Sequence, residues 1–249
     1  MVEIKTHAEI ERMRESALVS AECMDRVLAA AKPGVTTKEL DEIAEKLITK
    51  AGGEPSFKNY RGYPASVCTS INSEVVHGIP SSKTVLMEGD ILSVDLGVKL
   101  KGYHSDMART VPVGKISSQA QKLIEVTEKS FFAGVENAKT GNRLNDISQS
   151  VEFTVRAAGF SVVRDLVGHG VGRNLHEAPD IPNFSQPRRG PVLKAGMVLA
   201  IEPMVNIGGH KVYWLDDGWT VKTTDGSLSA HYENTVAITD NGPYILTIP

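Results

Sequence analysis

The 249-residue chain lacks several features that mark particular classes of protein. It has only two cysteines, Cys23 and Cys68, and they form no CxxC pair, so neither a disulfide framework nor a thiolate zinc site is predicted. No stretch approaches the roughly 18 consecutive apolar residues of a membrane-spanning helix, and the charged N-terminus has no apolar signal core. We therefore expect a cytoplasmic protein without a membrane anchor.

The chain also lacks a strong charge of either sign. Its formal net charge is −3, from 27 basic and 30 acidic side chains. A protein that binds nucleic acid or an anionic membrane needs a basic surface, so neither partner is predicted. The composition, 41% hydrophobic and 23% charged, is that of an ordinary globular protein long enough to bury a substantial core.

A weak internal repeat runs through the sequence at one constant offset of 107 residues. The segment AKPG at 31–34 returns as AKTG at 138–141, and GDILSVD at 89–95 returns as GMVLAIE at 196–202. One offset that holds through several segments favours a duplicated architecture. We expect a single domain over residues 1–249, built from pseudo-repeats at about 1–114 and 115–249, because no linker-like segment separates them.

Each half is predicted to contain two helices and several antiparallel strands. Capping boxes at Thr6–Glu9 and Thr36–Glu39 mark the starts of the first two helices, and glycines at 52–53 end the second. Further helices are expected at about 120–138 and 145–158, and strands at about 91–98, 161–166, 198–204 and 235–238. Helices packed on an antiparallel sheet give an α+β fold.

Two acids interrupt strands that are otherwise apolar. Asp95 lies in the middle of the run 91–98, and its counterpart in the repeat, Glu202, lies in a similar run. Burying an isolated ionised carboxylate costs on the order of several kcal/mol unless it is protonated, paired or bound to a cation. Because the same cost recurs at equivalent positions, we interpret both acids as site residues.

Each of these acids has a second acid farther along the chain. Asp106 follows Asp95 by 11 residues, and Glu233 follows Glu202 by 31. A turn centred between positions 100 and 101 would place Asp95 directly opposite Asp106 on paired strands. Four converging carboxylates must either take up protons or bind cations, and two divalent ions would balance their charge. Oxygen ligands suit Mn, Fe(II), Co or Zn in paired catalytic sites.

Three of the seven histidines lie where functional side chains are common, at the ends of strands and in loops. His169 lies in GHGVG, whose glycines leave the imidazole accessible, and it is the candidate nitrogen ligand. His77 follows an apolar run, and His176 closes the loop after the glycine cluster. His104 and His231 each lie two residues before a candidate ligand acid; they would share its face of a strand, and their role stays open. An ordinary core or surface histidine is the alternative at each position.

With Asp95, Asp106, His169, Glu202 and Glu233 in place, the chain resembles the type I methionine aminopeptidases of the bacterial kind. The segments VCTSINSEVVHGIP, VDLGVKLKGYHSD, GHGVGRNLHEAP, IEPM and HYENT resemble that family's motifs in order and spacing, over essentially the whole chain. The resemblance implies the pita-bread fold, an α+β fold with two pseudo-symmetric halves. It also implies that metal-activated water removes the N-terminal methionine of nascent proteins, with a preference for a small second residue.

The resemblance further implies roles for particular residues. The five residues above would hold two divalent ions, with Asp106 and Glu233 bridging and Glu202 also acting as the general base. His77 and His176 would contact the substrate, His176 near the scissile carbonyl. The residues implied for the methionine pocket are Tyr60, Tyr63, Cys68, Leu175 and Trp219. Ordinary core packing is the alternative for these apolar side chains.

Two other functions are compatible with parts of this pattern. Xaa-Pro peptidases of the same fold use the same five ligands but usually carry an additional N-terminal domain, for which a first helix starting near residue 6 leaves no room. Pita-bread proteins that bind peptides without catalysis typically lack ligands, whereas all five are present here. The sequence does not select the metal and leaves ribosome association open; a monomer that acts on nascent chains is expected.

Overall fold

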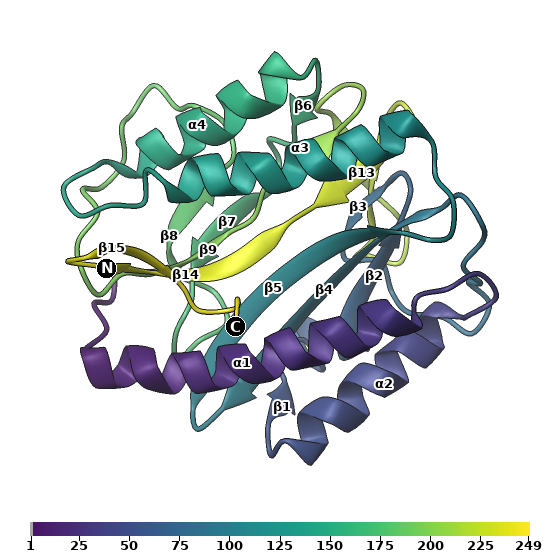
Figure 1. The fold of residues 1–249 in the computed structure, drawn as a ribbon, viewed down its shortest axis with the longest axis horizontal. Coiled ribbons are helices and arrows are strands. Elements are labelled where there is room, and N and C mark those ends of the chain that lie inside the picture. Colours follow the sequence, from purple (N-terminus) through teal and green to yellow (C-terminus); the bar gives the residue numbers. More distant parts are fainter. Residues whose placement is uncertain (1) are drawn as a thin grey trace.

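The computed structural model describes residues 2–249, in which four helices lie outside a curved antiparallel sheet (Figure 1). The helices are α1 (His7–Ala30), α2 (Thr37–Lys50), α3 (Ser118–Val135) and α4 (Leu144–Ala157), and the short 3-10 turn η1 spans Tyr60–Gly62. In Figure 1, α1 and α2 cover one half of the sheet, and α3 and α4 cover the other. Among residues 2–249, none of the helices combines the length and apolarity needed to cross a bilayer.

The strands form one large and two small sheets. They are β1 (Glu54–Pro55), β2 (Val67–Ile71), β3 (Glu74–Val76), β4 (Ile91–Leu100), β5 (Tyr103–Pro112), β6 (Ser161–Val162), β7 (Val167–Gly170), β8 (Glu177–Pro182), β9 (Val198–Ile201), β10 (Met204–Asn206), β11 (Val212–Trp214), β12 (Val221–Thr223), β13 (Ser229–His231), β14 (Glu233–Thr239) and β15 (Gly242–Ile245). The large sheet has the order β1-β4-β5-β14-β9-β7-β8, with β2 added at β4 and β15 at β14. The pairing of β5 with β14 joins the two halves of the chain.

The first two helices begin where the capping boxes predict. The hydroxyl of Thr6 accepts from the backbone N–H of Glu9, and the carboxylate of Glu9 accepts from the backbone N–H of Thr6. Thr36 and Glu39 make the same reciprocal pair at the start of α2. These bonds satisfy N–H groups that have no partner within the helix, so the sequence prediction is confirmed.

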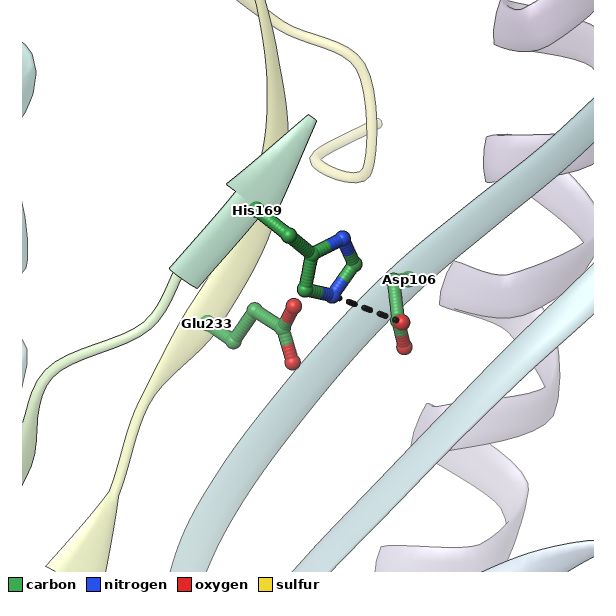
Figure 2. Close-up of side chains that lie close together, drawn as sticks. All are labelled: Asp106, His169 and Glu233. Atoms are coloured by element: carbon green, nitrogen blue, oxygen red, sulfur yellow. Dashed lines mark ion pairs between the residues drawn. The ribbon is translucent and has the colours of Figure 1, made fainter. Parts of the chain in front are cut away.

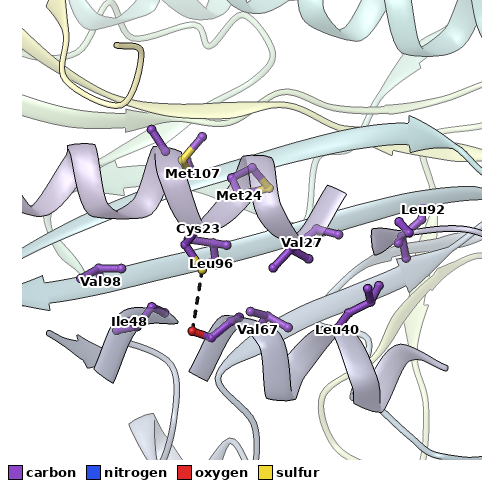
Figure 3. Packing of buried hydrophobic residues seen from close by; sticks show 14 of the residues in the cluster. Cys23, Met24, Val27, Leu40, Ile48, Val67, Leu92, Leu96, Val98 and Met107 are labelled. Carbon is purple, nitrogen blue, oxygen red and sulfur yellow. Dashed lines mark hydrogen bonds between the residues drawn. The ribbon is translucent and has the colours of Figure 1, made fainter. Parts of the chain in front are cut away.

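The helices pack on one face of the large sheet through alternate strand residues. Met24 of α1 and Leu40 of α2 are buried in the same cluster as Val94, Leu96 and Val98 of β4 (Figure 3). A second cluster joins α3 and α4 to β9 and β14; it includes Phe131, Ile147, Leu199, Ile201, Val236 and Ile238. Because successive strand residues point to opposite faces, the residues between these, including Asp95, project from the other face.

The 107-residue offset recurs in the structure. Shifting the bounds of α2 by 107 gives the bounds of α4. The isolated bridge between Thr36 and Val85 returns as a bridge between Arg143 and Val192, again shifted by 107 at both ends. The predicted α+β class with two related halves is therefore confirmed.

Two expected strands are shorter in the structure. The strand expected at 161–166 extends only over β6 (Ser161–Val162). The strand expected at 198–204 is divided into β9 and β10, and the break includes Pro203. Proline has no N–H to donate to a neighbouring strand, so regular pairing stops beside Glu202.

The hairpin between β4 and β5 turns one residue later than predicted. Its two turn residues are Lys101 and Gly102, with φ of 51° and 84°, as a two-residue turn of type I′ requires. Asp95 therefore lies opposite Ala108, and Asp106 lies two residues away on the diagonal. The expectation that the two acids face each other directly was wrong, although both still project from the same face of the sheet.

Candidate metal centre and substrate cavity

A row of side chains across four strands positions three of the candidate ligands. Cys68 of β2 pairs with Asp95 of β4, Asp95 pairs with Ala108 of β5, and Ala108 pairs with Glu233 of β14. Glu202 follows β9 at the end of the same row, since β9 pairs with β14 in that register. The small side chain of Ala108 leaves space between the carboxylates on either side.

A second row lies two residues farther along the strands. The backbone N–H of Asp106 donates to the hydroxyl of Thr235 at 2.9 Å, and that hydroxyl donates back to the Asp106 carbonyl at 2.9 Å. Thr235 pairs with Ala200, and Ala200 pairs with His169 of β7. Since side chains alternate with a period of two, Asp106 and His169 project from the same face as the first row.

Asp106, His169 and Glu233 form a buried group that could hold a metal ion. One ligand atom from each lies within 4.8 Å of the others, and Figure 2 shows the three side chains converging from three strands. Nε2 of His169 lies 3.7 Å from Oδ2 of Asp106 and 3.6 Å from Oε1 of Glu202.

The ring of His169 is oriented for ligation through Nε2. Nδ1 lies 2.8 Å from the carbonyl oxygen of Gly170. A carbonyl can only accept a hydrogen bond, so Nδ1 carries the proton in the neutral ring and Nε2 carries the free lone pair. A backbone carbonyl is a common partner for the second nitrogen of a metal-binding histidine.

The four carboxylates cannot all be charged in this environment without cations. Burial raises the pKa of Asp95 and of Glu202 to about 7. Burial and then the neighbouring acids raise the pKa of Asp106 and of Glu233 well above the ordinary range. Within residues 2–249, Oδ1 of Asp95, Oδ1 of Asp106 and Oε1 of Glu233 are buried without a hydrogen-bond partner. Carboxylate oxygens without hydrogen-bond partners and one free imidazole nitrogen are suitable ligands for a divalent transition-metal ion.

One cavity of about 140 Å³ contains every residue that the sequence analysis assigned to metal or substrate. Its lining includes the five candidate ligands Asp95, Asp106, His169, Glu202 and Glu233 and the seven candidate substrate contacts Tyr60, Tyr63, Cys68, His77, Leu175, His176 and Trp219. Tyr63, Cys68 and Leu175 are buried in one apolar cluster, against which Tyr60 and Trp219 pack. The cavity therefore has a carboxylate end and an apolar end.

Of the two candidate substrate histidines, His176 lies between these ends and His77 lies at the apolar end. His176 stacks on Tyr60 with ring centroids 5.2 Å apart, and its centroid is 4.0 Å from that of His169. His77 meets Trp219 edge to face at 6.3 Å. Burial lowers the pKa of His77 to about 4 and that of His176 to about 3, so both rings are neutral near pH 7 and each has one N–H to donate.

Three residues near the site were not assigned to it by the sequence analysis: Phe57, Arg61 and His231. Phe57 and Arg61 line the cavity, and the only sequence signal for either was its position close to Tyr60. Nε2 of His231 lies 3.7 Å from Oε2 of Glu202 and 3.9 Å from a carboxylate oxygen of Glu233. His104 does not line the cavity, and its Nδ1 lies 2.8 Å from the hydroxyl of Ser56.

The sequence matches known metallopeptidases over nearly its whole length. The profile described as metallopeptidase family M24 matches residues 11–240. A methionine aminopeptidase of Clostridium perfringens is 57% identical over 248 residues, which cover 100% of this chain and 99% of the relative. A methionine aminopeptidase of Escherichia coli is 41% identical, with 99% of this chain and 94% of the relative covered.

The structure matches solved structures of the same kind. The crystal structure of a methionine aminopeptidase from Thermotoga maritima superposes with a TM-score of 0.98 at 43% identity, with all of both chains covered. A prolidase from Pyrococcus furiosus superposes with a TM-score of 0.77 at 27% identity, covering 99% of this chain but 65% of the prolidase. These matches confirm the predicted pita-bread fold and the resemblance to bacterial methionine aminopeptidases.

Proposed function

The chain belongs to metallopeptidase family M24, and we propose that it removes the N-terminal methionine from nascent proteins, with a preference for a small second residue. The observation that carries the proposal is the cavity in which a carboxylate cluster adjoins an apolar end. Relatives named methionine aminopeptidase are 57% and 43% identical to the chain, whereas the prolidase is 27% identical. The greater similarity favours methionine removal over cleavage of Xaa-Pro bonds.

Two divalent ions are the proposed cofactors. Their ligands would be Asp95, Asp106, His169, Glu202 and Glu233, and two ions balance four carboxylates that are otherwise forced toward protonation. When bound, such ions lower the pKa of a coordinated water and polarise a peptide carbonyl. The ligand set suits Mn, Fe, Co or Zn.

Glu202 is the proposed general base. It lies beyond the end of β9, next to His169, and it is outside the compact group formed by Asp106, His169 and Glu233. Its carboxylate would take the proton from the attacking water and pass it to the leaving amine, a role that acids of this type fill in many hydrolases.

His77 and His176 are the proposed substrate contacts. Each neutral imidazole can donate one N–H, and the stacking of His176 on Tyr60 limits its rotation. His176 would donate to the scissile carbonyl oxygen, where negative charge develops during attack. The methionine side chain would occupy the apolar end, in contact with Cys68 and Leu175.

The chain is further proposed to act as a cytoplasmic monomer on newly made polypeptides. An apolar end that accepts one side chain, together with a requirement for a free α-amino group beside it, would limit cleavage to the first residue. The substrate chain beyond the second residue would then remain outside the cavity.

A peptide panel tests this function. The protein is stripped of metal, reconstituted anaerobically with each candidate ion, and incubated with Met-Ala-Ser, N-acetyl-Met-Ala-Ser and Ala-Pro. We expect free methionine from Met-Ala-Ser alone, because the blocked peptide lacks the free amino group. Cleavage of Ala-Pro without release of methionine would favour an Xaa-Pro peptidase, and binding of Met-Ala-Ser without cleavage would favour a non-catalytic protein.

A further inference from the structure

The N-terminal arm, residues 2–6, lies against the loop that supplies two of the cavity residues. In Figure 1 the arm descends from the N-terminus to the start of α1. The backbone N–H of Lys5 donates to the carbonyl of Gly196 at 2.7 Å, which fixes the arm to the second half of the chain. Lys5 is only 6% exposed, and a buried ammonium group requires a paired anion.

That anion is the carboxylate of Glu177. The side chains of Lys5 and Glu177 are in direct contact and only 4% and 9% exposed, respectively. Lys5 also contacts Glu3 at 2.8 Å, but the side chain of Glu3 is 51% exposed. Burial alone would raise the pKa of Glu177, but bonds from Asn174 and then Lys5 outweigh it and lower that pKa. The contact between Lys5 and Glu177 is therefore a buried ion pair.

The side chain of Glu177 also holds the preceding residues 174–176 in a tight turn. Its Oε1 accepts the backbone N–H of Asn174 at 3.0 Å, so the bond encloses Leu175 and His176. These two enclosed residues line the cavity, whereas Lys5 does not. A displacement of the Glu177 carboxylate would be transmitted to both side chains through one turn of backbone.

The backbone makes room for the ion pair at Gly172. A Cβ atom at this position would lie 2.4 Å from Cε of Lys5 and 2.9 Å from Oε1 of Glu177. Both distances are shorter than a normal contact between these atoms. The side chain of Lys5 can therefore reach Glu177 only because Gly172, in the same loop, has no side chain.

We propose that Lys5 is a positioning residue: through Glu177 it fixes Leu175 and His176 against the rest of the cavity without touching the substrate. The proposal rests on the proposed function, in which these two residues contact the substrate. A role in stability alone is the competing explanation. The two differ in what happens to the site of the folded protein when the pair is broken.

Lys5→Met is the main test variant, because methionine keeps an unbranched apolar chain but has no charge. Lys5→Arg keeps the charge and serves as the rescue, and Glu3→Gln removes only the exposed partner. Two properties are measured: the Cε1–H proton resonance of His176, assigned with His176→Gln, and kcat and KM for Met-Ala-Ser. The affinity for Mn²⁺ is measured alongside as a control for the ligand group.

In Lys5→Met we expect the His176 resonance to shift and kcat/KM to fall by roughly 10- to 100-fold, since small displacements of contact groups have effects of this size. Mn²⁺ affinity should stay within about twofold, because the pair does not touch the ligands. Glu3→Gln should behave as wild type, and Lys5→Arg should recover most of the loss. If Lys5→Met does not fold, Glu177→Gln, which keeps the shape of the acid, is expected to give the same shift and a fall in the same direction.

The proposal is overturned if Lys5→Met, or Glu177→Gln in its place, lowers only the melting temperature while the His176 resonance and kcat of the folded protein stay at wild-type values. The resonance does not depend on catalysis. A wild-type protein that releases no methionine would therefore contradict the proposed function, while the His176 resonance would still decide whether Lys5 positions this loop.

Discussion

Asp95 and Glu233 lie on either side of a single residue, Ala108, which pairs with both of them on the strand between. Asp95 comes from the first half of the chain and Glu233 from the second, so the two halves contribute acids to one row. Beside this methyl group, within residues 2–249, Oδ1 of Asp95 and Oε1 of Glu233 have no hydrogen-bond partner. This arrangement favours a cation between the two carboxylates.

Replacing Asp106 should remove tight metal binding. In Asp106→Asn the side chain has about the same size but no charge, so we expect the affinity for Mn²⁺ to fall by at least ~100-fold, since loss of even an outer-shell partner costs roughly 10- to 100-fold. Isothermal titration of metal-free protein measures this change. Asp240→Asn, at an exposed position, is the matched control and should bind as wild type; equal affinities for all three proteins would remove Asp106 from the ligand set.

Replacing Glu202 should mainly slow the chemical step. A general base typically contributes about 100-fold or more to the rate, and in Glu202→Ala no other acid is free to take its place. We expect kcat for Met-Ala-Ser to fall by at least ~100-fold when Mn²⁺ is saturating. Activity within twofold of wild type would contradict the assigned role of this residue.

The metal-free protein should lose stability as the pH rises from about 6.5 to 8. Asp95 and Glu202 have a pKa of about 7 in the folded state against roughly 4 in an unfolded chain. The folded form therefore binds more protons in this range, and stability falls with rising pH. Burial lowers the pKa of His77, His104 and His176 to between about 3 and 4 and also lowers that of His231. Because an unfolded histidine has a pKa of roughly 6.5, these rings have the opposite effect, which fades by about pH 7.5. The four carboxylates outweigh it from pH 6.5, since burial also raises the pKa of Asp106 and of Glu233.

Melting temperatures measured in chelator across this range check the prediction. Asp95→Asn removes one of the raised carboxylates and should show a shallower decline, and saturating Mn²⁺ should abolish the decline because the ion replaces the protons. A metal-free protein whose melting temperature rises from pH 6.5 to 8 would show that the carboxylates are not held together in the folded state.

A core substitution tests the proposal that residues 1–249 form one domain. Leu96 of β4 is fully buried against α1 and α2, so Leu96→Ala should cost about 2–5 kcal/mol of unfolding free energy. Leu18→Ala, at a position that is 42% exposed, should change it by less than about 0.5 kcal/mol.

Urea unfolding followed by two probes gives these free energies. The only tryptophans, Trp214 and Trp219, lie in the second half, whereas far-UV circular dichroism reports on both halves. In a single domain the two transitions coincide, and Leu96→Ala in the first half shifts both. A tryptophan transition that does not move would indicate halves that unfold separately.

Much of the candidate site was predictable because its residues differ in type from their neighbours in the sequence. Burying a charged acid within an apolar strand, as at Asp95, costs free energy unless the acid is protonated, paired or bound to a cation. The repeat supplied a second example at Glu202. Flanking glycines set His169 apart from the other histidines in the same way. These signals depend on residue type and spacing, which a sequence displays directly.

The remaining features depend on contacts that no local pattern encodes. A turn at Lys101 and Gly102 rather than one residue earlier changes which residues face each other, and both registers place the acids on the same face. Lys5 and Glu177 are 172 residues apart, so their contact follows only from how the two halves pack. The spacing of His231 and Glu233 already places them on one face of a strand, whereas the approach of His231 to Glu202 follows only from how the strands pair.

The most direct test of the account is the release of methionine from Met-Ala-Ser by metal-free protein as Mn²⁺ is added in known equivalents under anaerobic conditions. We expect no release without metal and a rise that saturates at two equivalents per chain, with no release in Asp106→Asn at the same additions. Undiminished release by the metal-free protein, or no release at saturating metal with any of the candidate ions, would contradict it.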